Sequence, residues 1–460
     1  MTAYWLDWLS LLGRWLHLVA GIAWIGSSFY FIWLDNHLLP PVDPTLGGRG
    51  VAGELWAVHG GGFYNSHKYR VAPETLPSTL HWFYWEAYTT FLSGFFLLAL
   101  LYYGRAEVYL IDPSVATLSK PVAIATGLAF LVGGWLAYDG LCRSPLGRRP
   151  PVLAAVLVAL LSAAAWALCH LFSGRGAYME FGAMLGTIMV ANVFFVIIPG
   201  QRELVRAKRE GRELDPRYGI AGKLRSTHNT YFTLPVLFVM ISHHYAMTYG
   251  ARENWLVLIA MCAAGAALRV YFVSRHKAHE RGGHTSPLPA AVGLLTVAVV
   301  ALVLMPRPGP GPVANSGQTA ATAGMASGLG TASGVGTTNG ASTANGADTS
   351  SAAGTTNGAG TTNGAGTANG ASTAANSGFA RIQAIVAQRC ISCHSTNPTQ
   401  AGFAAPPNGL RLDTPESILA HATQMRQQIA TRAMPLGNIT GITEEERAEM
   451  LAWIDRGAPH

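Results

Sequence analysis

Long apolar segments separated by polar loops make up the first 305 residues of the 460-residue chain. The hydrocarbon core of a bilayer is about 30 Å thick, and about 20 mostly apolar residues in a helix cross it. The pattern predicts a transmembrane helix over each segment that approaches this length. These eight segments cover residues 9–34, 80–104, 121–141, 152–172, 179–199, 226–248, 255–274 and 287–305.

The composition also favours a membrane protein. Hydrophobic residues make up 50% of the chain and charged residues 12%, whereas about 25% of the residues in soluble domains are charged. The formal net charge is +7, but the basic residues are concentrated in loops, above all between residues 200 and 225. Basic loops mark the cytoplasmic side of a membrane protein. We therefore expect a lipid bilayer, and no nucleic acid, as a partner.

Residues 306–378 differ sharply from the apolar segments before them. Gly, Ala, Thr, Asn and Ser dominate this stretch, and it contains near-repeats of Thr-Thr-Asn-Gly-Ala-Gly. A segment with so little apolar surface cannot build a core and behaves as a flexible coil. The composition predicts a disordered linker that tethers a C-terminal domain over residues 379–460.

The C-terminal domain contains the motif Cys390-Ile-Ser-Cys-His394. C-x-x-C-H is the attachment signature of a c-type haem, in which the two thiols bind the haem vinyl groups and the adjacent histidine ligates the iron. The alternative is half of a zinc site, but no second Cys/His pair follows at a zinc-like spacing. We predict one covalent haem c, bound by Cys390, Cys393 and His394.

The sequence around this motif resembles a small class I cytochrome c. The expected helices cover residues 379–388, 415–431 and 443–456, and the last opens on a capping box from Thr443 to Glu446. Such folds take the sixth iron ligand from a methionine late in the chain. Met434 follows a predicted helix and precedes a proline, whereas Met425 and Met450 fall within predicted helices. Met434 is therefore the predicted ligand, and a His/Met pair raises the haem potential.

The haem motif and the loop charges indicate the same orientation. Bacterial cytochromes c are assembled outside the cytoplasmic membrane, and eight spans put both chain termini on one side. With the termini outside, the loops that carry most of the basic residues lie inside. We predict a multi-pass protein of the bacterial inner membrane, with both termini and the cytochrome domain on the periplasmic side.

Histidines are expensive in a membrane interior and are candidates for function. The predicted topology places four of them in the outer half: His17, His170, His243 and His244. The stretch from Arg14 to Gly26 resembles the first helix of bacterial membrane haem proteins that include the oxygen-independent-type protoporphyrinogen oxidase. We predict that His17 and His243 bind a b-type haem. Alternatively, these histidines bond to neighbouring helices or lie at the headgroup level.

A second polar group is expected at the inner ends of the helices. It comprises His81, Glu86, Asn192, His228, Asn229 and Thr230. These residues offer donors, acceptors and a carboxylate without a metal-like spacing, and the aromatic residues from Trp82 to Tyr88 could stack on a planar ligand. We predict a pocket for a polar heterocycle; the alternative is an interfacial aromatic belt. The glycine-containing loop from His59 to Arg70 either contacts an anion or is an ordinary inside loop.

Several stretches together resemble the bacterial membrane-bound urate oxidases, or urate hydroxylases. They are His17 with Trp24-Ile-Gly26, Gly60-Gly-Gly62 with His67-Lys-Tyr, Leu80-His-Trp-Phe-Tyr-Trp-Glu86, Ser226-Thr-His-Asn-Thr230 and the fused cytochrome. The resemblance implies that urate is oxidised to 5-hydroxyisourate and that the electrons pass to cytochrome c rather than to oxygen. The resemblance implies that the candidate catalytic residues are Glu86, His81 and His228. It also implies that a respiratory electron acceptor receives the electrons from the cytochrome.

The sequence thus predicts an all-α protein with three parts: an eight-helix transmembrane bundle (1–305), a disordered linker (306–378) and a small class I cytochrome c domain (379–460). Two other classes of protein also fit these residues. One is an electron-transfer subunit that oxidises quinol and reduces its own tethered cytochrome. The other is a haem-linked sensor or assembly factor.

Overall fold

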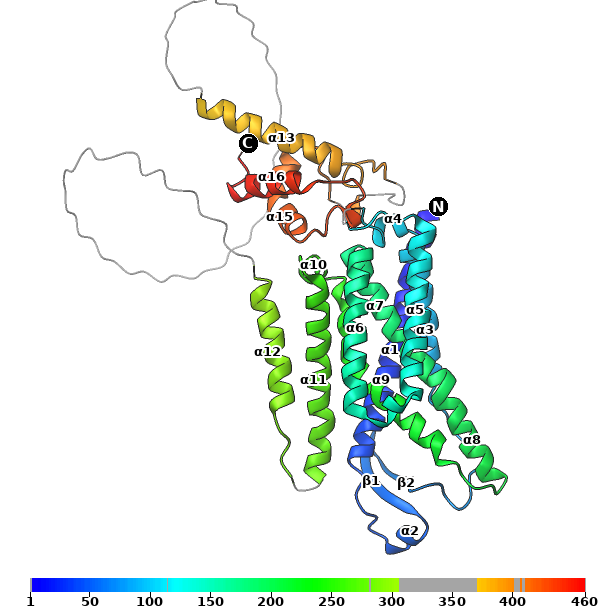
Figure 1. Cartoon of the computed structure of the whole chain (residues 1–460). Coiled ribbons are helices and arrows are strands. Elements are labelled where there is room, and N and C mark those ends of the chain that lie inside the picture. The colour runs from blue at the N-terminus through cyan, green and yellow to red at the C-terminus, as the bar shows by residue number, and fades with distance from the viewer. Residues whose placement is uncertain are drawn as a thin grey trace, which may run out of the picture. The chain divides into compact units, whose positions relative to one another are not determined.

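The computed structural model describes residues 2–113, 115–280, 283–305, 370–400, 406–407 and 410–459. The membrane domain is a bundle of long, roughly parallel helices (Figure 1). Its elements in chain order are α1 (Thr2–Asn36), α2 (Pro44–Gly48), β1 (Val51–His59), β2 (Gly62–Tyr69), α3 (Trp85–Leu97), η1 (Leu98–Tyr103), α4 (Ala106–Tyr109), α5 (Lys120–Arg143), η2 (Pro145–Arg148), α6 (Pro150–Leu171), α7 (Gly174–Ala191), η3 (Asn192–Ile197), α8 (Ile198–Arg209), α9 (Pro216–Ser242), α10 (Ala246–Tyr249), α11 (Asn254–Glu280) and α12 (Leu288–Val303).

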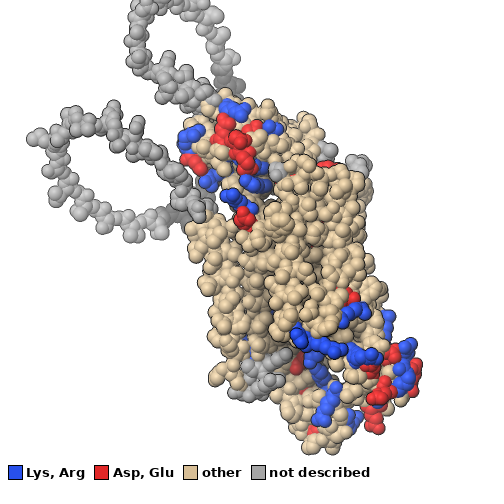
Figure 2. Space-filling view, in the orientation of Figure 1, with Lys and Arg blue, Asp and Glu red and all other residues tan. Residues whose placement is uncertain are grey.

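Five helices among the described residues are long and apolar enough to cross a membrane: Trp8–Asn36, Lys120–Arg143, Pro150–Leu171, Gly174–Arg209 and Asn254–Arg275. The other three predicted segments are also helical. α12 is apolar but has only 16 residues, and α9 has 27 residues but carries polar side chains in its first half. The eight-helix count therefore remains a prediction. On the face drawn in Figure 2, the charged side chains of the membrane domain gather at one end of the bundle.

α7 is the central helix of the bundle, and it packs closely against its neighbours. Tyr178, Phe181 and Leu185 are at most 1% exposed. A methyl group added at Gly182 would lie 2.5 Å from Cγ1 of Val239 on α9, so only glycine permits this approach. Small residues at helix crossings are typical of membrane bundles, because no hydrophobic effect drives helix association in lipid.

Two π-helical turns interrupt the bundle. η1 continues α3, and η3 lies between α7 and α8. Such turns are rare and often lie at functional sites, because the wider turn changes the direction in which side chains point. η3 begins at Asn192, whose side chain is completely buried.

The prediction of an all-α fold is wrong for the loop after α1, which forms an antiparallel β-hairpin. β1 and β2 pair from Val51–Tyr69 to His59–Gly62. The two turn residues, Gly60 and Gly61, have φ values of 56° and 79°. A two-residue turn with positive φ at both positions matches the twist of the strands. The turn requires residues that tolerate positive φ, so it explains both glycines without an anion as ligand.

We use this hairpin to name the two ends of the bundle. It projects from the end at which α1 finishes, here called the hairpin end, and the chain starts at the opposite end, here called the N-terminal end (Figure 1). A buried carboxylate holds the hairpin to the segment before it. Glu54 accepts hydrogen bonds from the N–H of Val42 at 2.6 Å and from Asn65 at 2.9 Å, and lies 3.4 Å from His67.

The C-terminal part of the chain is helical and has its own core. Its elements are α13 (Gly370–Arg389), α14 (Pro415–Ala420), α15 (Ala422–Ala430), η5 (Leu436–Asn438) and α16 (Glu444–Asp455). The predicted capping box at Thr443 and Glu446 is confirmed. The helix expected over 415–431 is broken at His421, and α13 begins nine residues before the position expected. The predicted linker lies largely in 306–369, outside the described residues, and the predicted domain boundaries stay predictions.

Replacing Glu54 by alanine should loosen the hairpin, because it removes the buried acceptor of the hydrogen bonds from the N–H of Val42 and from Asn65. Hydrogen exchange of the amides in residues 51–69 should become faster, with Glu74→Ala, an exposed carboxylate, as the control. The N–H of Val42 and the amide of Asn65 hold the pKa of Glu54 below its usual value. The stabilisation is therefore complete above the unfolded-state pKa and is lost as the pH falls through the folded-state pKa. Equal exchange in both variants would contradict this role.

Candidate functional site

The C-x-x-C-H motif forms a tight turn directly after α13. The N–H of Cys390 bonds to the carbonyl of Val386, and the N–H of His394 bonds to the carbonyl of Cys390 at 2.9 Å. His394 Nδ1 lies 3.2 Å from the carbonyl of Leu410. Because a carbonyl only accepts, Nδ1 carries the proton and Nε2 keeps its lone pair, which is the arrangement of a metal-bound histidine. Burial lowers the pKa of His394 and favours the neutral imidazole that binds iron.

The three methionines near this turn have different surroundings. Met425 and Met450 are 5% and 0% exposed and belong to the core of the C-terminal part. Met434 lies between α15 and η5, outside that core, and its carbonyl accepts a hydrogen bond from Arg447 at 2.8 Å. Met434 is therefore not needed for core packing, and its role as an iron ligand stays a prediction. No cluster of three or more metal-binding side chains occurs among the described residues.

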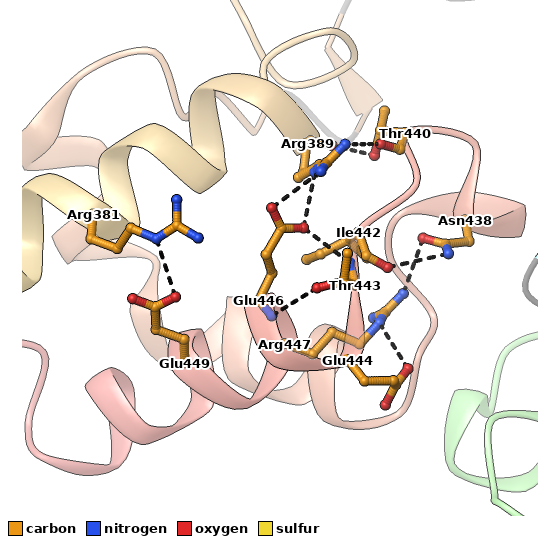
Figure 3. A network of polar contacts seen from close by, with 10 residues as sticks. All are labelled: Arg381, Arg389, Asn438, Thr440, Ile442, Thr443, Glu444, Glu446, Arg447 and Glu449. Atoms are coloured by element: carbon orange, nitrogen blue, oxygen red, sulfur yellow. Dashed lines mark hydrogen bonds and ion pairs between the residues drawn. The ribbon is translucent and has the colours of Figure 1, made fainter.

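A polar network connects the segments that would hold the haem (Figure 3). Arg389, next to Cys390, donates to both carboxylate oxygens of Glu446 on α16 at 3.0 and 3.1 Å, and to the carbonyl of Thr440 at 2.7 Å. Arg447, one residue further along α16, holds the carbonyl of Met434. The segment with Cys390 and the segment with Met434, which would hold the haem from its two sides, are thus both bonded to α16. The residues fit a covalent haem c.

At the N-terminal end of the bundle, His17 faces α3. Its Nδ1 lies 2.9 Å from the carbonyl of Thr90 and 3.1 Å from the hydroxyl of Ser93. A methyl group at Gly94 would lie 2.8 Å from the His17 ring, so the glycine makes room for the imidazole. The carbonyl requires the proton on Nδ1, and no hydrogen bond to Nε2 is found in the described part of the chain.

His243 shows the same arrangement at the end of α9. Its Nδ1 donates to the carbonyl of Met240 at 2.7 Å, and its Nε2 is buried without a hydrogen-bond partner. His244 stacks beside it at 3.8 Å between ring centroids, and exposed His170 bonds back to Trp166. His17 and His243 each have Nδ1 at a carbonyl and no hydrogen bond to Nε2 among the described residues, which is the state an iron ligand needs. The binding of a b-type haem by these two residues stays a prediction.

At the hairpin end, a buried polar network joins α5, η3 and α9. The Tyr138 hydroxyl lies 2.8 Å from His228 Nδ1 and accepts from Asn192 at 3.1 Å. Asn192 also donates to Asn229 at 2.8 Å. Arg225 donates to Asp139 at 2.6 Å, and its guanidinium lies 4.9 Å from the centre of the Tyr138 ring.

This network contains three of the six residues that the sequence placed in the inner polar group: Asn192, His228 and Asn229. Thr230 bonds only within its own helix, to the carbonyl of Ser226. His81 is exposed, and no contact in the described part of the chain links His81 or Glu86 to His228. Sequence reasoning missed Tyr138, Asp139 and Arg225. Asp139, an acid near the end of a predicted span, was a signal that could have found them.

Among the described residues, five side chains, His243 included, have buried polar atoms without a hydrogen-bond partner. The atoms are Arg175 Nε and His243 Nε2 at the N-terminal end, Glu180 Oε1 within α7, and Glu86 Oε2 with Arg269 Nε and Nη2 towards the hairpin end. Unpaired buried polar atoms are rare in folded proteins, and a missing ligand is one explanation for them. Arg269 stacks 3.8 Å from the centre of the Phe29 ring. The sequence had not pointed to Arg175, Glu180 or Arg269.

The family of the membrane domain is shown by comparison with known protein families. The model of the urate oxidase N-terminal family matches residues 3–303. The match covers more than half of the chain, so the chain belongs to this family, and a role as a urate-related oxidoreductase follows. No curated protein and no solved structure matches the chain.

Arg225 and Arg143 provide a matched test of the network, because both pair with Asp139 at 2.6 Å. The Arg225 side chain is 4% exposed and the Arg143 side chain is 67% exposed. Removing one partner of a buried ion pair costs about 3–5 kcal/mol, whereas exposed pairs contribute about 0–1 kcal/mol. Arg225→Leu should lower the melting temperature of the purified protein clearly, and Arg143→Leu should change it little. Similar decreases in melting temperature would show that burial does not determine how much each ion pair contributes to stability.

Substitutions at the methionines and cysteines test the haem c site. Cys390→Ala or Cys393→Ala should abolish covalent haem staining. Met434→Ala should keep the covalent haem but remove the weak red absorption band that reports Met–iron ligation, because the sulfur ligand is lost. Met425→Ala is the control, since this side chain packs in the core. Loss of the band in Met425→Ala with retention in Met434→Ala would show that the ligand is Met425.

Proposed function

We propose that the chain oxidises urate to 5-hydroxyisourate at the hairpin end of its membrane domain and passes the electrons to its own haem c rather than to oxygen. The family match supports urate as the substrate. In the balanced reaction, urate and water give 5-hydroxyisourate, two protons and two electrons. Residues Cys390, Cys393, His394 and Met434 would hold the haem c, which supplies a one-electron acceptor of raised potential.

The observation that carries the substrate site is the set of unpaired polar atoms towards the hairpin end. Arg269 has two unpaired donors, Nε and Nη2, on the same edge of its guanidinium, and Glu86 has one unpaired acceptor. Both border α1: Arg269 stacks on Phe29, and Trp24 packs with the cluster around Ala87, next to Glu86. A planar anion with carbonyl oxygens and ring N–H groups can satisfy both side chains.

The side chains have distinct roles in this proposal. The Arg269 edge binds the anionic side of urate through two parallel hydrogen bonds, a geometry that arginine favours. Glu86 takes the proton from the attacking water as general base. His228 stays a candidate catalytic residue through its contact with Tyr138, and His81 is the third candidate from the sequence. His17 and His243 would hold a b-type haem, which supplies a one-electron carrier between the substrate site and the haem c.

The family and haem motifs also support the setting of this reaction. We place the protein in the bacterial inner membrane, with the lipid bilayer around its helices and both termini on the periplasmic side. A respiratory electron acceptor would reoxidise the haem c.

A quinol-oxidising electron-transfer subunit is the second candidate function. It is favoured by an apolar cavity of about 560 Å³ between α5, α6, α7 and α9. Leu161, Ala164 and Met184 line it, and it extends to Tyr138 of the polar network. An apolar cavity with a polar end suits a lipid-soluble quinone.

The purified protein with its haems should be reduced by urate under anaerobic conditions, recorded as the haem absorption change, and should not be reduced by quinol. Glu86→Gln should keep all haems and slow urate oxidation by about 10²- to 10⁴-fold, the usual contribution of a general base. Glu74→Gln, an exposed carboxylate in the loop before α3, is the control. Reduction by quinol alone would favour the second function. A fully active Glu86→Gln would exclude Glu86 as the base.

A further inference from the structure

A cation without a carboxylate partner lies at the N-terminal end of the bundle. Arg175 is in the first turn of α7, and its Nε is buried without a hydrogen-bond partner. Its guanidinium carbon is 5.1 Å from the centre of the Tyr109 ring, and Tyr102 and Tyr249 also lie beside it. Within the described part of the chain, no carboxylate is within ion-pair distance of Arg175. A buried charge without a counter-charge is strongly unfavourable.

A second arginine lies in the same region. Arg14 is on α1, one turn before His17, so the two side chains share a face of the helix. Its side chain is exposed, and within the described residues its Nε has one hydrogen bond, to the hydroxyl of Ser10 at 3.3 Å. The charges of Arg14 and Arg175 both act on Tyr102 and on His243. Two arginines and His243 therefore lie in one region. Arg14 comes from α1, Arg175 from α7 and His243 from the end of α9, and Tyr102 of η1 lies among them.

The two arginines lie at the N-terminal end of the bundle, and His17 lies one turn deeper. Arg14 precedes His17 on α1, and Arg175 opens α7 at that end. His243 caps the last turn of α9 and lies at the same end as Arg175. The first turn of a helix also favours anions, through its unpaired backbone N–H groups. The region thus offers positive charge and the free Nε2 of His243 at its end, and the free Nε2 of His17 one turn further in.

We propose that Arg14 and Arg175 bind the two propionate carboxylates of a haem whose iron is ligated by His17 and His243. This inference rests on the b-type haem of the proposed function and assigns the residues that hold its charged edge. A haem has an apolar edge that suits the helix interior and two carboxylates that need cations. A single small anion would account for the arginines but not for two imidazoles with free Nε2 atoms.

The test measures the ratio of non-covalent haem b to covalent haem c in the purified full-length protein, by the pyridine haemochrome assay. Arg14→Gln and Arg175→Gln should each release haem b to a haem-scavenging protein at least tenfold faster than the wild type. Arg175→Lys should restore part of the retention, because it keeps the charge but loses the paired hydrogen bonds. His17→Ala should remove haem b completely. The haem c content is the reference for the amount of protein, and the melting temperature of each purified variant shows that its membrane domain has folded.

Arg252→Gln is the matched control, because Arg252 is an exposed arginine in the loop before α11 at the same end of the bundle. It should leave the haem ratio and the release rate unchanged. An Arg14→Gln/Arg175→Gln double variant with wild-type haem retention would overturn the proposal, as would a wild-type protein that contains only haem c. Retained haem b with a raised KM for urate would also overturn it and show that the anion is the substrate. Absence of urate-dependent reduction would contradict the proposed function but leave the haem-release result intact.

Discussion

Polar and charged side chains in an apolar membrane interior must be paired, and the arrangement of this membrane domain depends on that requirement. At the hairpin end it is met within the protein, where Arg225 reaches Asp139 and the side chains of Tyr138, Asn192 and Asn229 bond to one another. Outside this network the requirement is not met: among the described residues, Arg175, Glu180 and Arg269 keep buried atoms without hydrogen-bond partners. The contrast separates side chains that stabilise the bundle from side chains that are available to a ligand.

The available side chains differ in chemistry along the bundle. The N-terminal end has cations and imidazoles, which suit an iron-bearing dicarboxylate. The region towards the hairpin end has an arginine edge and a carboxylate, which suit a planar heterocyclic anion. In the proposed function, this separation would let proton removal and electron transfer use different residues, so that each set keeps the charge and geometry its own chemistry requires.

The sequence predicted those features whose residues are neighbours in the chain. The turn from Cys390 to His394 and the capping box at Thr443 are local patterns, and the structure forms both. The Arg225–Asp139 pair was missed because its residues are 86 positions apart. The hairpin was missed because the loop around Gly60 and Gly61 was interpreted only as an anion contact or an ordinary loop, and its two strands show no regular alternation of buried and exposed positions. Arg269 lies within a predicted transmembrane segment, and a charged residue there could have been recognised from the sequence as a candidate for function.

The close approach of Gly182 to Val239 has a mechanical consequence for α7. α7, η3 and α8 follow one another without a break, with Arg175 in the first turn of α7 and Asn192 at the start of η3. Because the crossing leaves no room for a methyl group at Gly182, a larger side chain there would push α7 away from α9. The helix that carries Arg175 and the helix that carries Arg225 and His228 would then separate, so one glycine sets the spacing of both polar regions.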